Sequence, residues 1–278
     1  MRSHRSTDTG SHRVRVGLCS VTFRSLGASE VLGRAAEAGL ESIEWASDSH
    51  VRPGDLDAAA QVGEQTRAAG LAVASYGSYL RFPWAREPYE TATELIGTGV
   101  ALGAPRVRVW AGPYGSKDAT AEQRQSVIDD LRRTAALAAA KGVEVAVEYH
   151  SRTLADDAPA TVALLAEVAA DNLSTYWQPR IGASDDAAVA DLDALLGWVS
   201  TVHVFSWGDR LDRHPLVSRE AMWRRVFARL CRAPRVTDAL LEFLPDDDPG
   251  LLAGEAAQAK AWRDQALTTT GVPTTEGP

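Results

Sequence analysis

The stretch LAAAKGVEVAVEYH (residues 137–150) contains the end of one predicted helix and the whole of one predicted strand. Its Ala-rich part favours a helix, Gly142 supplies a left-handed C-cap, and its Val-rich part favours a buried strand. The same order occurs in RAAEAGLESIEW (34–45), TRAAGLAVASYG (66–77) and GVALGAPRVRVW (99–110). The closing glycines are 31, 33 and 39 residues apart, which accommodates one strand, one helix and two loops per unit.

This unit can be extended over most of the chain. The β-prone runs are residues 14–21, 42–45, 71–77, 106–110, 143–149, 173–177, 201–207 and 238–244. Helical patterns follow them, and residues 248–267 supply the last one. In the helix predicted over 120–141, Thr120 and Gln123 form a capping box. Its apolar stripe is Val127, Leu131, Ala135 and Ala138.

Eight alternating strand–helix units predict an α/β protein of the (β/α)8 TIM barrel class, as a single domain. An open doubly wound sheet is the alternative, but no Gly-rich phosphate-binding fingerprint follows any predicted strand. A chain of 278 residues with 45% hydrophobic composition can bury a core of this size. We expect the barrel to occupy residues 14–267, with a disordered N-terminal extension at 1–13 and a disordered tail at 268–278.

The overall charge indicates a small-molecule partner. A formal net charge of −8 disfavours nucleic acid, because phosphate binding is driven by Lys and Arg. No apolar run approaches the roughly 18 residues of a membrane span. The only cysteines, Cys19 and Cys231, form no disulfide framework and fit a reducing compartment, so we expect a cytoplasmic protein. The sequence leaves the oligomeric state open, a homo-oligomer included.

Polar side chains stand at the ends of four successive predicted strands: Glu148, Gln178, His203 and Glu242. In a TIM barrel, the carboxyl ends of the strands build the active site. A buried carboxylate needs a partner, and a divalent cation is an economical partner for two carboxylates, an imidazole and an amide oxygen. These four residues therefore predict a metal site. Mn²⁺ is the preferred ion, with Mg²⁺, Co²⁺ and Zn²⁺ as alternatives.

The four residues, in the motifs VEYHSRTLADD (147–157), YWQP (176–179), VHVFSW (202–207) and LLEF (240–243), carry a family resemblance. The chain resembles the sugar phosphate isomerase/epimerase superfamily, the xylose isomerase-like TIM barrels, over residues 14–266. The segments 43–51 and 75–81 resemble the family's second and third strand ends. In this family a Glu, an Asp, a His and a Glu bind one divalent metal, and the two glutamates transfer protons. The resemblance thus implies that Glu148 and Glu242 are catalytic.

Gln178 departs from the family pattern because it replaces the ligating aspartate. Its amide oxygen can still coordinate, but the ligands carry two formal negative charges where the family has three. We expect a lower metal affinity and a more strongly Lewis-acidic metal. Arg180, beside it, is a predicted substrate contact, while Ile181 occupies a position where several relatives have a second histidine.

Other residues near the strand ends are predicted to bind substrate. His150 lies two residues beyond Glu148, so both face the barrel mouth. His50, Tyr79 and Glu44 follow or end the second and third strands. The predicted aromatic contacts with a sugar are Trp110, Trp177 and Trp207.

The predicted function is a metal-dependent isomerase or epimerase of a sugar or polyol derivative. It would abstract a proton next to a carbonyl through a metal-stabilised enediolate. A lyase of the dehydratase or carbon-glycoside-cleaving type is an alternative, because the same intermediate can expel a leaving group. A non-catalytic sugar-binding or regulatory protein with a weakened metal site is a third hypothesis.

Overall fold

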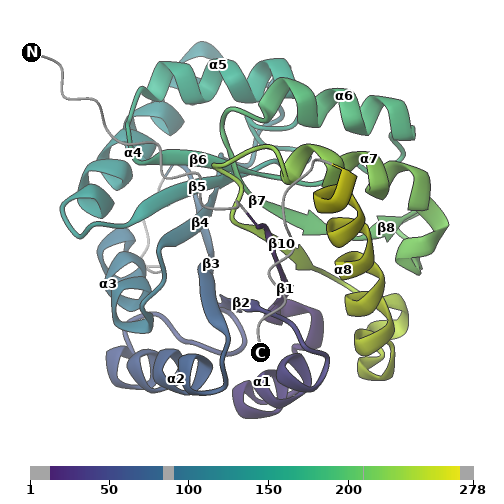
Figure 1. The fold of residues 1–278 in the computed structure, drawn as a ribbon. Helices are drawn as coiled ribbons and strands as arrows, with labels where there is room; N and C mark the ends of the chain where they lie inside the picture. The colour runs from purple at the N-terminus through teal and green to yellow at the C-terminus, as the bar shows by residue number, and fades with distance from the viewer. Residues whose placement is uncertain (1–12, 84–90, 209, 270–278) are drawn as a thin grey trace, which may run out of the picture.

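Eight parallel strands close into a barrel, and helices surround it (Figure 1). The computed structural model describes residues 13–83, 91–208 and 210–269. The barrel strands are β1 (Arg15–Cys19), β2 (Ser42–Ala46), β3 (Ala72–Arg81), β4 (Arg106–Trp110), β5 (Glu144–Glu148), β6 (Leu173–Trp177), β7 (Val199–Val204) and β10 (Asp238–Leu241). They pair in chain order, and β10 pairs with both β7 and β1 to complete the circle. The (β/α)8 prediction is confirmed.

The helices alternate with the strands along the described chain. They are α1 (Ala28–Glu37), α2 (Leu56–Ala68), α3 (Ala92–Leu102), α4 (Ala121–Ala139), α5 (Ala158–Val168), α6 (Asp185–Leu195), α7 (Glu220–Leu230) and α8 (Leu252–Thr269). The predicted capping box of α4 is present, and the four residues of its predicted stripe are buried. The four closing glycines all adopt left-handed φ angles, from 62° at Gly39 to 80° at Gly70. None of the described helices is both long and apolar enough to cross a bilayer.

Some short elements lie outside this alternation. The 3-10 helices are η1 (Ser20–Phe23), η2 (Leu216–Arg219), η3 (Pro245–Asp247) and η4 (Pro249–Leu251). The predicted seventh strand is divided: β7 ends at Val204, and β8 (Ser206–Trp207) pairs antiparallel with β9 (Arg213–His214). Residues 1–12 and 270–278, on which most of the predicted disordered ends fall, lie outside the described residues. Thr268 and Thr269 continue α8.

Successive side chains along a barrel strand point alternately to the helix layer and to the barrel interior. Ile43 and Trp45 belong to the large apolar cluster shared with the helices, so Ser42 and Glu44 face the barrel interior. The interior contains a smaller apolar cluster, and many of its other buried side chains are charged or polar. The smaller cluster comprises Cys19, Val21, Ala46, Ala74 and Leu240. Buried charges of this kind need partners, and they find them within the barrel.

Asp238 holds the floor of the barrel together. Its carboxylate accepts hydrogen bonds from Arg15 at 2.8 Å, from Arg106 Nη1 at 3.3 Å and from Ser42 Oγ at 2.7 Å. Arg106 also donates to the Thr201 hydroxyl on β7, so the network joins opposite sides of the barrel. Burial alone would raise the pKa of Asp238, but the hydrogen bond and charge of Arg15 outweigh it and the pKa is lowered.

Replacing Asp238 by Asn is expected to lower the free energy of unfolding by about 3–5 kcal/mol, because the buried Arg106 loses the closer of its two carboxylate partners. Since the folded pKa is lowered, this stabilisation is present above the unfolded value of roughly 3.9 and is lost as the pH falls through the folded value. The difference between wild type and variant should therefore narrow below about pH 4. Urea unfolding at pH 7 and below 4 measures it. Asp186→Asn removes an exposed partner of Arg225 and is the control, expected to cost under about 1 kcal/mol.

Candidate active site at the barrel mouth

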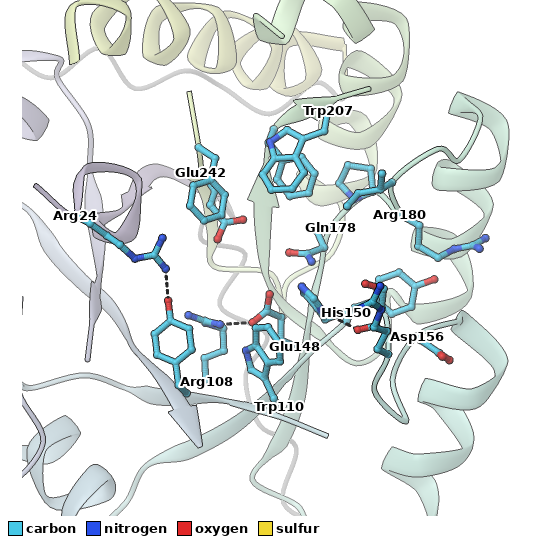
Figure 2. Close-up of a pocket in the computed structure, with 18 residues that line it drawn as sticks. Arg24, Arg108, Trp110, Glu148, His150, Asp156, Gln178, Arg180, Trp207 and Glu242 are labelled. Carbon is cyan, nitrogen blue, oxygen red and sulfur yellow. Dashed lines mark hydrogen bonds and ion pairs between the residues drawn. The ribbon is translucent and has the colours of Figure 1, made fainter. Parts of the chain in front are cut away.

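A cavity of about 430 Å³ opens at the carboxyl ends of the strands, and we call it the mouth cavity (Figure 2). It lies where a TIM barrel places its active site. Its lining residues are Arg24, Tyr79, Arg108, Trp110, Glu148, Tyr149, His150, Ser151, Arg152, Asp156, Gln178, Pro179, Arg180, Ile181, Phe205, Trp207, Glu242 and Phe243. Carboxylates lie beside aromatic rings and arginines, which suits a hydroxylated ligand with polar and apolar faces.

His203 brings two of the predicted ligands together. Its Nδ1 lies 3.0 Å from Gln178 Oε1 and 3.3 Å from Glu242 Oε2. His203 is fully buried on β7, while Gln178 and Glu242 stand one residue beyond β6 and β10 and line the mouth cavity. One amide oxygen and one carboxylate oxygen thus lie within 3.3 Å of the same imidazole nitrogen.

The fourth predicted ligand, Glu148, shares the cavity but is paired with a guanidinium. Arg108 Nη1 donates to Glu148 Oε2, and Arg108 Nε donates to Glu44 Oε1 at 3.0 Å. All three side chains are almost fully buried. Ser75 Oγ donates to the other oxygen of Glu44 at 2.7 Å. Arg108 is therefore a cation fixed between two carboxylates.

Gly77 provides the space for this pairing. A Cβ atom at residue 77 would lie 2.6 Å from Glu44 Oε1 and 2.9 Å from Arg108 Nη2. The glycine on β3 is thus required by the close approach of two charged side chains on β2 and β4.

The buried charges shift one another's pKa values. Burial raises the pKa of Glu242 to about 7. Burial would also raise the pKa of Glu44, but the guanidinium of Arg108 and the imidazole of His203 hold it well below its usual range. For His203, burial favours a lower pKa, and the charges of Glu242 and Glu44 outweigh it, so the pKa is raised. The negative potential around this imidazole also attracts a cation.

The donor set fits a divalent cation. Gln178 Oε1 and Glu242 Oε2 lie close to His203 Nδ1, so one nitrogen and two oxygens are available together, and Glu148 lies in the same cavity. A second group of donor atoms lies deeper, where those of Cys19, Glu44 and His203 are within 4.8 Å of one another. This group is less suitable, because burial raises the pKa of the Cys19 thiol and so disfavours the thiolate that would bind a metal.

Most other predicted substrate contacts line the mouth cavity. His150 stacks on Trp110 with ring centroids 4.2 Å apart, and Trp207 forms part of the opposite wall with Phe243. The Tyr79 hydroxyl accepts a hydrogen bond from Arg24 at 2.7 Å. Burial raises the pKa of Tyr79 to about 12, so the hydroxyl stays protonated.

Arg180 also borders the cavity, but its charge is directed elsewhere. Its Nε donates to Asp191 Oδ2 at 2.7 Å, and the Tyr149 hydroxyl bonds the same oxygen at 3.1 Å. Figure 2 shows the guanidinium turned away from Glu148 and Glu242. The guanidinium of Arg180 is therefore held by Asp191 of α6, and its charge does not point into the cavity.

Three predicted substrate contacts lie outside the lining of the mouth cavity. Trp177 is one residue before Gln178, so it points to the opposite side of β6 and packs against Trp223 of α7 in the helix layer. His50 bonds Ser20 Oγ at 2.9 Å and the Leu26 carbonyl at 3.1 Å, which fixes a loop. Glu44 lies beneath the cavity, where it binds Arg108.

The sequence predicted Arg180 at the site, but the other arginines of the cavity lining, Arg24, Arg108 and Arg152, were missed. Arg108 was recognisable, because RVRVW places Arg106, Arg108 and Trp110 on one face of β4 and the valines on the other. Arg24 and Arg152 stand in loops, where no periodicity indicates the direction of a side chain.

Comparisons with known proteins agree with this architecture. A profile of the xylose isomerase-like TIM barrel family matches residues 32–230. The chain is 24% identical, over 198 residues, to a 3-dehydroshikimate dehydratase of Bacillus anthracis, covering 68% of this chain and 71% of that protein. The similar solved structures include the following two. The first is the probable 3-DHS dehydratase of petrobactin synthesis from Bacillus anthracis, with a TM-score of 0.75, 19% identity, and 88% and 98% of the two chains covered. The second is an L-ribulose 3-epimerase, with a TM-score of 0.71, 17% identity, and 95% and 100% covered. At these identities the structural likeness establishes the fold.

Proposed function

Because the chain belongs to the xylose isomerase-like TIM barrel family, we propose that it is an enzyme removing a proton next to the carbonyl of a hydroxylated, carbohydrate-like substrate. One observation carries the proposal: two buried carboxylates with unlike partners face the same cavity. Glu148 is ion-paired with Arg108, whereas Glu242 faces His203 and Gln178. Two carboxylates in different surroundings are the usual form of an acid–base pair.

The partners assign the roles. Arg108 Nη1 donates a hydrogen bond to Glu148 Oε2 and fixes the direction of the carboxylate, so Glu148 is proposed as the base that takes the C–H proton. Glu242, without a guanidinium partner among the described residues, is proposed as the acid that delivers a proton. Figure 2 shows the two carboxylates extending toward one another across the cavity. A substrate carbon between them would have a carboxylate on either side.

We propose that Gln178, His203 and Glu242 hold a divalent cation, Mn²⁺ first, with Glu148 as the fourth ligand. When bound, such an ion would supply positive charge that stabilises the developing negative charge on the substrate oxygens. The surrounding side chains orient the substrate: Tyr79 and His150 through polar atoms, and Trp110 and Trp207 through their ring faces.

Replacing Gln178 by Asp is expected to raise Mn²⁺ affinity by about 10-fold or more, because a third formal negative charge joins the ligands. Isothermal titration calorimetry of the purified protein with Mn²⁺ measures the change. Asp171→Asn, which removes an exposed charge on the loop before β6, is the control and should leave the affinity unaltered. An equal affinity of wild type and Gln178→Asp would place residue 178 outside the ligand set.

Two outcomes can follow the first proton transfer. Return of a proton to the opposite face, or to the neighbouring carbon, gives epimerisation or isomerisation. Loss of a β-hydroxyl group gives dehydration, the second candidate, which the likeness to a 3-dehydroshikimate dehydratase favours. Incubation in D₂O with Mn²⁺ and a panel of ketoses, inososes, 3-keto-glycosides and 3-dehydroshikimate separates them. Deuterium in a recovered sugar supports the first, and loss of water the second. No exchange and no metal binding would instead favour a non-catalytic role.

A further inference from the structure

Four arginines line the mouth cavity, and their charges are not equally balanced. Arg108 is paired with Glu44 and Glu148, Arg24 with Asp48 at 3.2 Å, and Arg180 with Asp191 at 2.7 Å. Arg152 has no ion pair or side-chain hydrogen bond to any of the residues that the structure describes.

The next carboxylate along the chain does not neutralise Arg152. Asp156, which also lines the mouth cavity, accepts a hydrogen bond from the Ser116 backbone at 3.1 Å and forms no ion pair with Arg152 within 4 Å. An exposed guanidinium at the edge of the cavity is therefore available to a ligand. Arg presents a planar fork of donors that matches a carboxylate.

The backbone at Arg152 is in an uncommon conformation. Its φ of 61° lies in the left-handed region, which costs an L-residue other than Gly or Asn roughly 1 kcal/mol or more. A network holds this turn: Thr153 Oγ1 donates to the His150 carbonyl at 2.8 Å and accepts from Ala155 N at 3.0 Å. Leu154 N donates to the Ala111 carbonyl at 2.9 Å, which anchors the turn to the loop after β4. The turn fixes the arginine two residues from His150, a neighbour in the cavity lining.

We infer that Arg152 binds a carboxylate group of the substrate. The inference rests on the proposed function in taking the mouth cavity as the substrate site, and it narrows the substrate class to hydroxylated carboxylic acids. The single unpaired guanidinium suits one carboxylate better than a phosphate dianion, which would call for more donors.

Binding of a matched ligand pair tests the inference without turnover. Shikimate, a cyclic trihydroxy carboxylate, and its neutral methyl ester are titrated into the protein by calorimetry, with the fluorescence of the cavity tryptophans as a second signal. Wild type should bind the acid about 10- to 100-fold more tightly than the ester, the range of a charge-assisted pair. In Arg152→Asn, this preference should fall to within about twofold, while the affinity for the ester stays unaltered. Asn tolerates the left-handed region, so the melting temperature should not fall.

Arg52→Gln is the matched control, because it also removes one positive charge. Arg52 stands on the loop after β2, outside the lining of the cavity. This variant should keep the preference for the acid. Wild type that binds neither compound or both equally overturns the inference, as does Arg152→Asn with the preference intact. Acid-selective binding without proton exchange on any substrate would leave the inference standing and reject the proposed function.

Discussion

Glu148→Gln and Glu242→Gln are each expected to slow the exchange of a substrate C–H proton with D₂O by about 10²- to 10⁴-fold. Glutamine keeps the shape of the side chain and one oxygen, so each variant should fold with the replaced side chain still in the cavity wall. The amide of glutamine, however, can neither take up nor deliver the proton that the carboxylate would transfer. The measurement is deuterium incorporation by mass spectrometry on whichever substrate the D₂O screen identifies.

Glu144→Gln provides the control, because Glu144 stands four residues before Glu148 on the same strand, at the floor of the barrel. It pairs loosely with Arg106 at 3.9 Å and Arg235 at 3.8 Å. The Glu144→Gln variant should exchange the substrate proton at the wild-type rate. If both Glu148→Gln and Glu242→Gln exchange as fast as wild type, the two glutamates are not the proton-transfer groups.

The barrel could be predicted because local signals repeat. A glycine C-cap followed by a β-prone run fixes the order of elements wherever it occurs, and Gly39, Gly70, Gly103 and Gly142 all have the expected left-handed φ. The length of each strand was less predictable, since β7 ends at Val204 and a separate hairpin continues the chain. Pairing partners, not composition, decide where a strand ends.

The candidate site could be predicted only in part. Residues at strand ends face the barrel mouth in any TIM barrel, so the convergence of Gln178, His203 and Glu242 follows from topology. Trp177 was assigned to the cavity although the alternation that turns Gln178 inward turns its neighbour outward. Glu44 does face inward, but how deep it lies depends on the stagger of β2 against β3 and β4, which the sequence does not specify.

Arg108→Met is expected to lower the free energy of unfolding by about 3–5 kcal/mol, because it leaves two buried carboxylates, Glu44 and Glu148, without their cation. Methionine retains much of the volume, so the loss is mainly electrostatic. Urea unfolding at neutral pH measures it. Arg108→Lys keeps the charge but cannot span both carboxylates as the guanidinium does, so it should fall between wild type and Arg108→Met.

A double variant separates charge from packing in this prediction. Glu44→Gln removes one of the two carboxylates, and Ser75 can still bond the remaining amide oxygen. If Arg108 acts by neutralising Glu44, then Arg108→Met/Glu44→Gln should be more stable than the sum of the two single variants predicts, by about 1–3 kcal/mol. Strict additivity would mean that Arg108 does not stabilise the protein through the charge of Glu44.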